Sequence, residues 1–103
     1  MPDLQVVAVL VAKPGQEEVL RGALGALVPP TLQEQGCLSY ELFESGAAPG
    51  TFVTVERWRE QSDLDAHLQT PHVQQVLATA GDALAGAPGI HPLVPVELPA
   101  VQQ

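Results

Sequence analysis

The sequence is short of cations. Its 103 residues include four Lys and Arg against twelve Asp and Glu, which gives a formal net charge of −8. A surface that binds nucleic-acid phosphates or an anionic membrane needs clustered Lys and Arg. We therefore expect neither nucleic acid nor a membrane among the partners of this protein.

Cysteine and long hydrophobic runs are also scarce. Cys37 is the single cysteine, so no disulfide can form within the chain, and a reducing compartment is the default expectation. No apolar run approaches the roughly 20 residues of a spanning helix. Asp3 stands where a signal peptide would carry a basic residue. These features predict a soluble, cytoplasmic protein.

Aromatic residues make up only 4% of the chain, although its apolar fraction is 46%. The core must therefore be built mainly from Val, Leu and Ala. A chain of 103 residues forms one small domain, and such a core is marginal alone. Burial against a second copy would stabilise it.

Hydrophobic periodicity predicts the first half of the fold. Leu4–Ala12 is a nearly continuous apolar run rich in Val, which suits a strand with both faces covered. Residues 16–32 have apolar positions at helical spacing, and Pro29-Pro30 is expected to end or bend that helix early. Strands are predicted over 38–44 and 51–58, joined by a hairpin connection that contains Gly and Pro.

The second half predicts a helix in two pieces and a last strand. Ser62 and Asp65 fit a capping box that starts a short helix. Thr70-Pro71 fits a fresh N-cap with Pro at the first helical position, so a second helical piece follows. Residues 90–98 are predicted to form a last strand, which its two prolines confine to an edge of the sheet or to irregular pairing.

This order of elements predicts an α+β fold. Two βαβ halves around a hairpin give the ferredoxin-like split βαβ arrangement, of the dimeric α/β-barrel type, with helices on one face of an antiparallel sheet. The other face needs cover, and a symmetric second subunit is the simplest answer, so we expect a homodimer. Residues 1–98 form the single domain, and residues 99–103 form a C-terminal tail.

Side chains able to do chemistry gather late in the third strand and in the helices after it. Glu56 and Trp58 share one face of that strand. His67 belongs to the apolar side of its helix, so its imidazole is expected to face the sheet, towards Trp58 and Glu56. A His near a carboxylate in an apolar pocket can act as a general base, which makes His67 and Glu56 the candidate catalytic residues. The alternative is a core His satisfied by one hydrogen bond.

Four residues are candidates for substrate binding: Trp58, His72, Tyr40 and Phe43. Each also has a structural explanation. Trp58 could be core, because the chain has few large side chains, and His72 could be solvated at the start of its helix. Tyr40 and Phe43 lie on opposite faces of the second strand, and either could line a cavity. Glu56 could instead pair with a surface arginine.

Neither a cofactor site nor a metal site is predicted. The glycines form no phosphate loop and no dinucleotide fingerprint. His67 and His72 are five residues apart, which does not align them on a helix, and Pro71 interrupts the helix between them. Cys37 has no neighbouring His or Lys in sequence to activate its thiol.

Four blocks of sequence together carry a family pattern: Ala12-Lys13-Pro14-Gly15, Glu34-Gln35-Gly36-Cys37-Leu38-Ser39-Tyr40, Glu56-Arg57-Trp58 and Asp65-Ala66-His67-Leu68-Gln69-Thr70-Pro71-His72. In their order and spacing they resemble the antibiotic biosynthesis monooxygenase family, and within it the small quinol monooxygenases of bacteria. The resemblance covers the chain from about Leu4 to Val96.

The resemblance implies a dimer with one pocket per subunit, between sheet and helices. It also implies oxidation of a small aromatic, phenolic or quinol substrate by O2 without flavin, haem or metal, because a deprotonated, electron-rich substrate can itself reduce O2. On the matching positions it implies His67 as base or substrate orienter, Trp58 as a pocket wall, and Glu56 and His72 as supporting polar groups. Tyr40 would line the pocket.

Relatives with other activities give alternatives. Haem-degrading members bind iron through a His that aligns with Leu77 here, which disfavours haem degradation. The autoinducer-2 phosphate isomerase shares a His-x-x-Thr-Pro-His-like segment, so a cofactor-free isomerase of that type is an alternative, although few cations are available to hold a phosphate. A non-catalytic small-ligand-binding domain is another alternative, since this fold hosts many functions.

Overall fold

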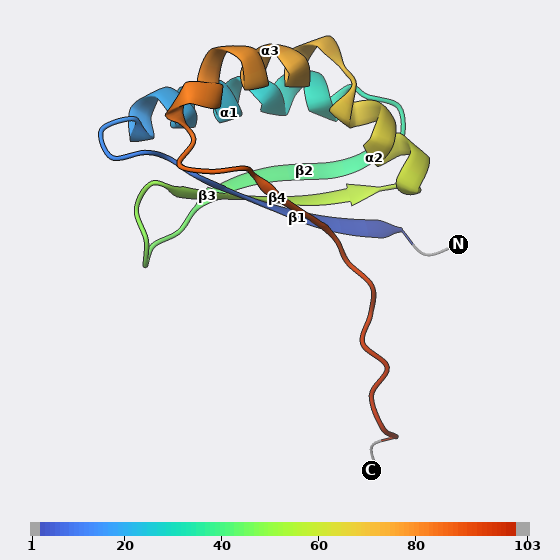
Figure 1. Cartoon of the computed structure of the whole chain (residues 1–103). Coiled ribbons are helices and arrows are strands. Elements are labelled where there is room, and N and C mark those ends of the chain that lie inside the picture. The colour runs from blue at the N-terminus through green and yellow to red at the C-terminus, as the bar shows by residue number, and fades with distance from the viewer. Residues whose placement is uncertain (1–2, 101–103) are drawn as a thin grey trace.

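The computed structural model describes residues 3–100, which form one four-stranded sheet with helices over one face (Figure 1). The elements are, in chain order, β1 (Leu4–Val11), α1 (Glu17–Leu32), β2 (Cys37–Glu44), β3 (Thr51–Trp58), α2 (Gln61–Leu68), α3 (Pro71–Ala80), the 3-10 helix η1 (Gly81–Ala83) and β4 (Gly89–Pro92). The predicted ferredoxin-like α+β fold is confirmed.

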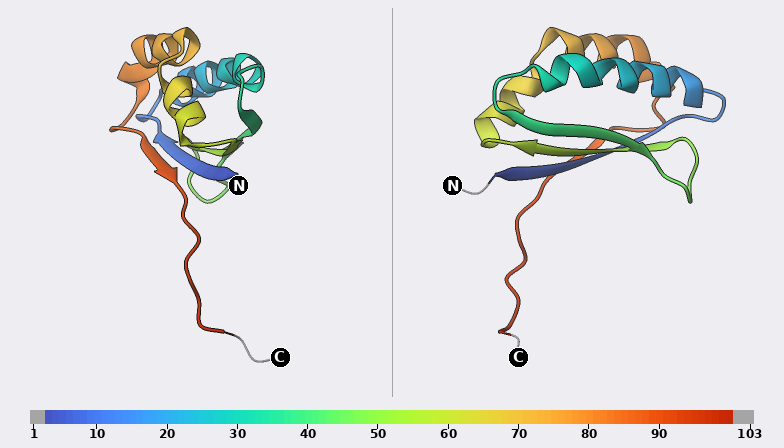
Figure 2. Two further views of the ribbon diagram at one scale, coloured as in Figure 1. Left: turned by 90° about the vertical axis from the view of Figure 1, so that its right-hand side faces the viewer. Right: turned by 180° about the vertical axis from the view of Figure 1, so that it is seen from behind.

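The strands lie in the order β2-β3-β1-β4, and each neighbouring pair is antiparallel. The last strand, β4, lies at the edge beside β1, as predicted. Figure 2 shows α1 and α3 side by side above the sheet, while the opposite face carries no helix. None of the described helices is long and apolar enough to cross a membrane.

Alternation along β3 decides what the sheet presents to the helices. Phe52, Thr54, Glu56 and Trp58 are all buried on the inner face, as predicted, whereas Val55 is 40% exposed on the other. The inner face therefore carries a hydroxyl and a carboxylate into an otherwise apolar space.

The core fills the layer between sheet and helices as two clusters. Leu20, Leu24 and Leu27 of α1 pack around Phe52 in the first. The second cluster, under α2, holds Val6, Tyr40, Trp58 and Leu64. Burying one large apolar side chain contributes about 1.5–3 kcal/mol, so this handful of residues dominates the stability of the domain.

The opposite side of the sheet, here called the open face, is also apolar. Val7 pairs with Val55, Val9 with Val53, and Phe43 with Val53, so these side chains lie next to one another. Phe43 is 50% exposed, and nothing in residues 3–100 covers this patch. Such a surface favours association with another apolar surface.

The expectation that Pro29-Pro30 ends α1 early is wrong. The helix continues through both prolines to Leu32. Each proline removes one hydrogen bond to the carbonyl four residues earlier, here those of Gly25 and Ala26. Gly25 and Ala26 are exposed, so water can donate hydrogen bonds to their carbonyls instead.

The predicted capping box of Ser62 and Asp65 does not form. Helix α2 begins two residues earlier than that box requires, after Glu60, which is extended and makes no side-chain cap. The first turn is fixed instead by Arg59, whose guanidinium donates hydrogen bonds of 2.9 and 3.1 Å to the carboxylate of Asp63.

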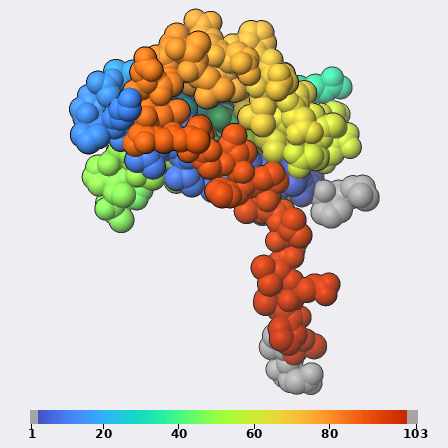
Figure 3. All heavy atoms as spheres, viewed as in Figure 1, coloured from blue at the N-terminus to red at the C-terminus, as the bar shows by residue number. Residues whose placement is uncertain are grey.

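The last strand is shorter than the predicted 90–98. Strand β4 ends at Pro92, the Leu93 N–H still donates to the Gln5 carbonyl of β1 at 2.8 Å, and residues 94–100 extend away from the sheet as an arm (Figures 1 and 3). Prolines at 92, 95 and 99 lack the N–H that a strand donates, which explains the early end. The predicted tail, 99–103, lies partly outside the described residues.

Candidate active site

A cavity of about 80 Å³ lies between the sheet and the helices. Figure 3 shows the surface hollowed between α3 and the segment leading to β4. Apolar side chains from all three helices, β1 and β4 make most of its wall. The polar groups that line it are Tyr40, Thr54, Glu56 and His67.

His67 projects from α2 towards the sheet. Its side chain is only 4% exposed. The ring centroid lies 4.8 Å from that of Trp58 and 5.6 Å from that of Tyr40. The prediction that His67 faces the sheet beside Trp58 is therefore confirmed.

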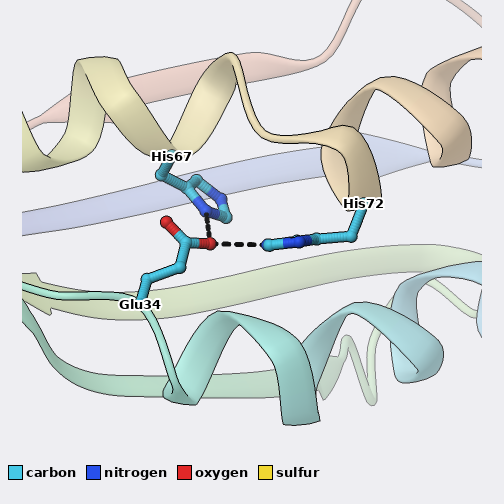
Figure 4. A group of neighbouring side chains, drawn as sticks. All are labelled: Glu34, His67 and His72. Carbon is cyan, nitrogen blue, oxygen red and sulfur yellow. Dashed lines mark hydrogen bonds and ion pairs between the residues drawn. The ribbon is translucent and has the colours of Figure 1, made fainter.

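The carboxylate that holds His67 is Glu34, in the turn between α1 and β2. Its Oε2 atom lies 2.7 Å from Nδ1 of His67 and 2.6 Å from Nε2 of His72 (Figure 4). The expected partner, Glu56, is occupied elsewhere. The Thr54 hydroxyl donates to one of its oxygens at 2.6 Å, and the indole N–H of Trp58 donates to the other at 2.8 Å.

These contacts assign the tautomer of His67. A carboxylate only accepts, so Nδ1 of His67 and Nε2 of His72 are the donors. The lone pair of a neutral His67 ring then lies on Nε2, which has no hydrogen-bond partner within residues 3–100. Because His67 lines the cavity, Nε2 is available to a molecule bound there.

The expectation that Pro71 keeps His67 and His72 apart is wrong. Thr70 is extended and caps α3, with Pro71 at the start of that helix as predicted. The Thr70 hydroxyl donates to the carbonyl of His67 at 2.7 Å and accepts from the N–H of Val73 at 3.4 Å. This turn redirects the chain so that both imidazoles point at one carboxylate (Figure 4).

The turn that carries Glu34 is fixed against the start of α2. Gly36 has φ +90°, and a Cβ added there would lie 2.2 Å from Cγ of Asp63. The Arg59 N–H donates to the Gly36 carbonyl at 2.8 Å. Its guanidinium also bonds Asp63 and holds the pKa of that carboxyl below its usual value. Glu34 and His67 are thus positioned by one packed junction.

Tyr40 lies opposite Glu56 in the sheet and is buried. Burial, followed by the nearby charges of Glu56 and Glu34, raises the pKa of its phenol above the ordinary value. The hydroxyl therefore stays protonated at neutral pH and can donate a hydrogen bond into the cavity. The same three causes raise the pKa of the Cys37 thiol to about 11, so that thiol is no nucleophile near neutral pH.

The other predicted site residues lie in three different places. Trp58 is fully buried behind His67 and orients Glu56 without lining the cavity. His72 lies at the outer edge, where it lines a second hollow between α1 and α3. Phe43 lies on the open face, away from the cavity. Glu34 was not among the predicted site residues, although it stands two positions before Gly36 in one of the four blocks.

Comparison with known proteins identifies a family and individual relatives of this chain. Residues 4–79 match the family model described as antibiotic biosynthesis monooxygenase. The chain is 36% identical to Rv0793 of Mycobacterium tuberculosis over 92 residues, covering 89% of this chain and 90% of that protein. It is 34% identical to "Probable quinol monooxygenase YgiN" of Escherichia coli over 92 residues, covering 79% and 88%.

Solved structures agree with the sequence comparison. The structure of Rv0793 superposes with a TM-score of 0.83 at 32% identity, covering 96% of this chain and 100% of that chain. A crystal structure named "antibiotic biosynthesis monooxygenase" gives a TM-score of 0.83 at 29% identity, covering 91% and 99%. Both similarities extend over the helices and strands that build the cavity.

Proposed function

The chain belongs to the antibiotic biosynthesis monooxygenase family, and from this premise we propose that it oxidises a small quinol-type aromatic with O2, without flavin, haem or metal. The relatives support a monooxygenase in general, and YgiN is named a quinol monooxygenase. The observation that carries the proposal is His67, a buried imidazole held by Glu34 at one nitrogen and available at the other in an apolar cavity.

The first step is removal of a phenolic proton. Nε2 of His67 accepts the proton, and the Glu34 carboxylate stabilises the resulting imidazolium through the 2.7 Å bond at Nδ1. A positioned base of this kind contributes about 10²- to 10⁴-fold in rate. The apolar cavity wall excludes water, which keeps the quinolate poorly solvated and a strong electron donor.

The oxidation balances without another reductant. The quinolate gives electrons to O2, one oxygen atom forms a new C–O bond on the ring, and the other leaves as water. Both electron pairs come from the quinol, which leaves as a hydroxyquinone. The proton held on Nε2 of His67 returns to the departing oxygen, which restores the neutral base.

Tyr40 supplies a hydrogen-bond donor that stabilises the negative charge developing on the substrate during oxidation. Its phenol stays protonated because burial raises its pKa, and Tyr40 lines the same cavity as His67. Loss of one such donor typically lowers kcat about 10²- to 10³-fold. Tyr40→Phe is therefore expected to reduce turnover while leaving the apolar wall in place.

The cavity suits a small aromatic molecule. A water needs about 10–15 Å³ on this scale, so about 80 Å³ accommodates roughly one aromatic ring. Leu77 and Ile90, which are 43% and 40% exposed, flank its mouth. None of the lining residues, all within 3–100, is Lys or Arg, which disfavours a phosphorylated substrate and hence the isomerase.

We further propose that two copies pair through the open face. The apolar side chains there, the half-buried Val7, Val9 and Val53 and the exposed Val55 and Phe43, form one continuous patch on the sheet. Burial of such a patch against a second copy removes it from water at about 25 cal/mol per Å². A symmetric pair also closes without further growth.

The test is oxygen uptake by the purified protein with one-ring and two-ring quinols and anthrones. Wild type is compared with His67→Gln, which keeps a donor for Glu34 but lacks a base, and with His91→Asn, which removes an exposed imidazole on β4. Circular dichroism confirms that each variant folds. We expect His67→Gln to lose at least about 10²-fold and His91→Asn to match wild type.

Two results would count against the proposal. Uptake that never exceeds the His67→Gln background with any substrate would refute the monooxygenase. Turnover of a substrate under strictly anaerobic conditions, dependent on His67, would instead support the proton-transfer isomerase.

A further inference from the structure

We propose that Glu34, His67 and His72 form a binding site for a divalent transition-metal ion. Their ligand atoms, Oε2 of Glu34, Nδ1 of His67 and Nε2 of His72, all lie within 4.8 Å of one another. Two imidazole nitrogens and one carboxylate oxygen make the donor set that zinc and neighbouring divalent metals prefer. The site comes from three separate segments: a turn, α2 and the start of α3.

The three side chains must rearrange to take a metal. Oε2 now lies 2.7 and 2.6 Å from the two nitrogens. Ligands at about 2.0–2.1 Å from a metal are separated by about 2.9–3.3 Å. The carboxylate must therefore withdraw by roughly 0.5 Å, and the two nitrogens, which lie within 4.8 Å of each other, must come close enough to share one ion. Rotation about the side-chain torsions of Glu34, His67 and His72 is the movement that this requires.

The site is accessible from outside without opening the main cavity. His72 is 25% exposed, whereas His67 is 4% exposed. His72 also lines the hollow between α1 and α3, so this ligand is reached from that side. The three protein ligands leave further coordination positions open for water.

A metal in this site would block the base described above, a consequence that rests on the proposed function. Binding to Nδ1 displaces its proton, so a neutral His67 ring then carries its single proton on Nε2. The nitrogen that is available in the cavity becomes a donor and no longer accepts a phenolic proton. Metal binding and turnover are therefore expected to be mutually exclusive.

The experiment is calorimetric titration of Zn²⁺ into protein stripped with a chelator. We expect one ion per chain for wild type and for His91→Asn. His72→Asn and Glu34→Gln, whose folding is verified by thermal melting, are each expected to bind at least about 10-fold more weakly. Wild type that takes up no Zn²⁺, or His72→Asn that binds as tightly as wild type, would overturn the site.

Turnover is measured separately, so the two proposals fail in different ways. Zn²⁺ binding in a protein that shows no oxygen uptake would leave the metal site standing and count only against the oxygenase. Oxygen uptake that is unchanged when Zn²⁺ saturates the site would refute the blocking role. Loss of uptake in proportion to the occupied fraction is the expected result.

Discussion

The junction at Gly36 gives a quantitative test of how the site is built. Gly36→Ala adds one methyl group at φ +90°, a backbone conformation that L residues rarely adopt. The new Cβ would lie 2.2 Å from Cγ of Asp63 and 2.5 Å from each of its carboxylate oxygens. Asp63 cannot simply swing away, because Arg59 holds both oxygens.

Two costs combine in this variant. Holding a residue other than Gly at such a φ costs about 1–3 kcal/mol, and forcing a methyl group into filled space costs about 1–3 kcal/mol. The free energy of unfolding should therefore fall by about 2–6 kcal/mol. For a domain of this size, 1 kcal/mol corresponds to about 4–8 °C, so Tm should fall by at least about 8 °C.

Chemical and thermal denaturation followed by circular dichroism measure this loss. Gly22→Ala is the matched control, because Gly22 is exposed inside α1 and nothing lies within 4 Å of its added Cβ. Ala is the better helix former, so the control should be more stable than wild type by up to about 1 kcal/mol. A Gly36→Ala protein within about 0.5 kcal/mol of wild type would refute the account of the junction.

Three further predictions follow from the site, the open face and the half-buried thiol. Glu34→Gln should lower quinol turnover about 10²- to 10⁴-fold in an oxygen-uptake assay, because the amide can donate to Nδ1 of His67 and fix the wrong tautomer. Unchanged turnover would contradict the role of His67 as the base. Val55→Lys should give a monomer by sedimentation while Val19→Lys, exposed on α1, stays dimeric; equal masses would contradict pairing through the open face. The Cys37 pKa of about 11 leaves little thiolate at neutral pH, so alkylation should be about 100-fold slower in the native than in the denatured chain at pH 8 and should accelerate as the pH rises towards 11; equal rates would contradict the burial.

The fold was predictable because the strands have two distinct faces. In β3 the buried and exposed residues alternate as its sequence indicates, from Phe52 to Trp58. A one-residue shift would expose the indole and the Glu56 carboxylate together, so the register is strongly specified. The resemblance of the four sequence blocks to a family agreed with this pattern and is confirmed by the family match.

Local errors arose at helix ends, where another local effect outweighed the expected one. Pro29-Pro30 is tolerated because it falls in the last turn of α1, next to exposed carbonyls. Ser62 does not cap α2, because the bond from Arg59 to Asp63 sets the first turn instead.

The site was predicted in part. His67 was identified from its place on the apolar side of its helix, and Tyr40 as one of two residues of the second strand that could line a cavity; both line it. Glu34 was missed because 33 residues separate it from His67, and a lone carboxylate in a turn reads as solvated. Glu56 was favoured because strand alternation makes it buried, but alternation cannot show that Thr54 and Trp58 occupy both of its oxygens.

The early end of β4 affects how the protein resists aggregation. A sheet of this order has two edges, and an unpaired edge strand can template the addition of other chains. At one edge, β4 is only four residues long, and the three prolines at 92, 95 and 99 interrupt the donors that a growing fibril would need. At the other edge, Glu41 and Glu44 of β2 place negative charge along the strand. The arm that makes the last strand short thereby also keeps a small, apolar-rich chain from extending its sheet indefinitely.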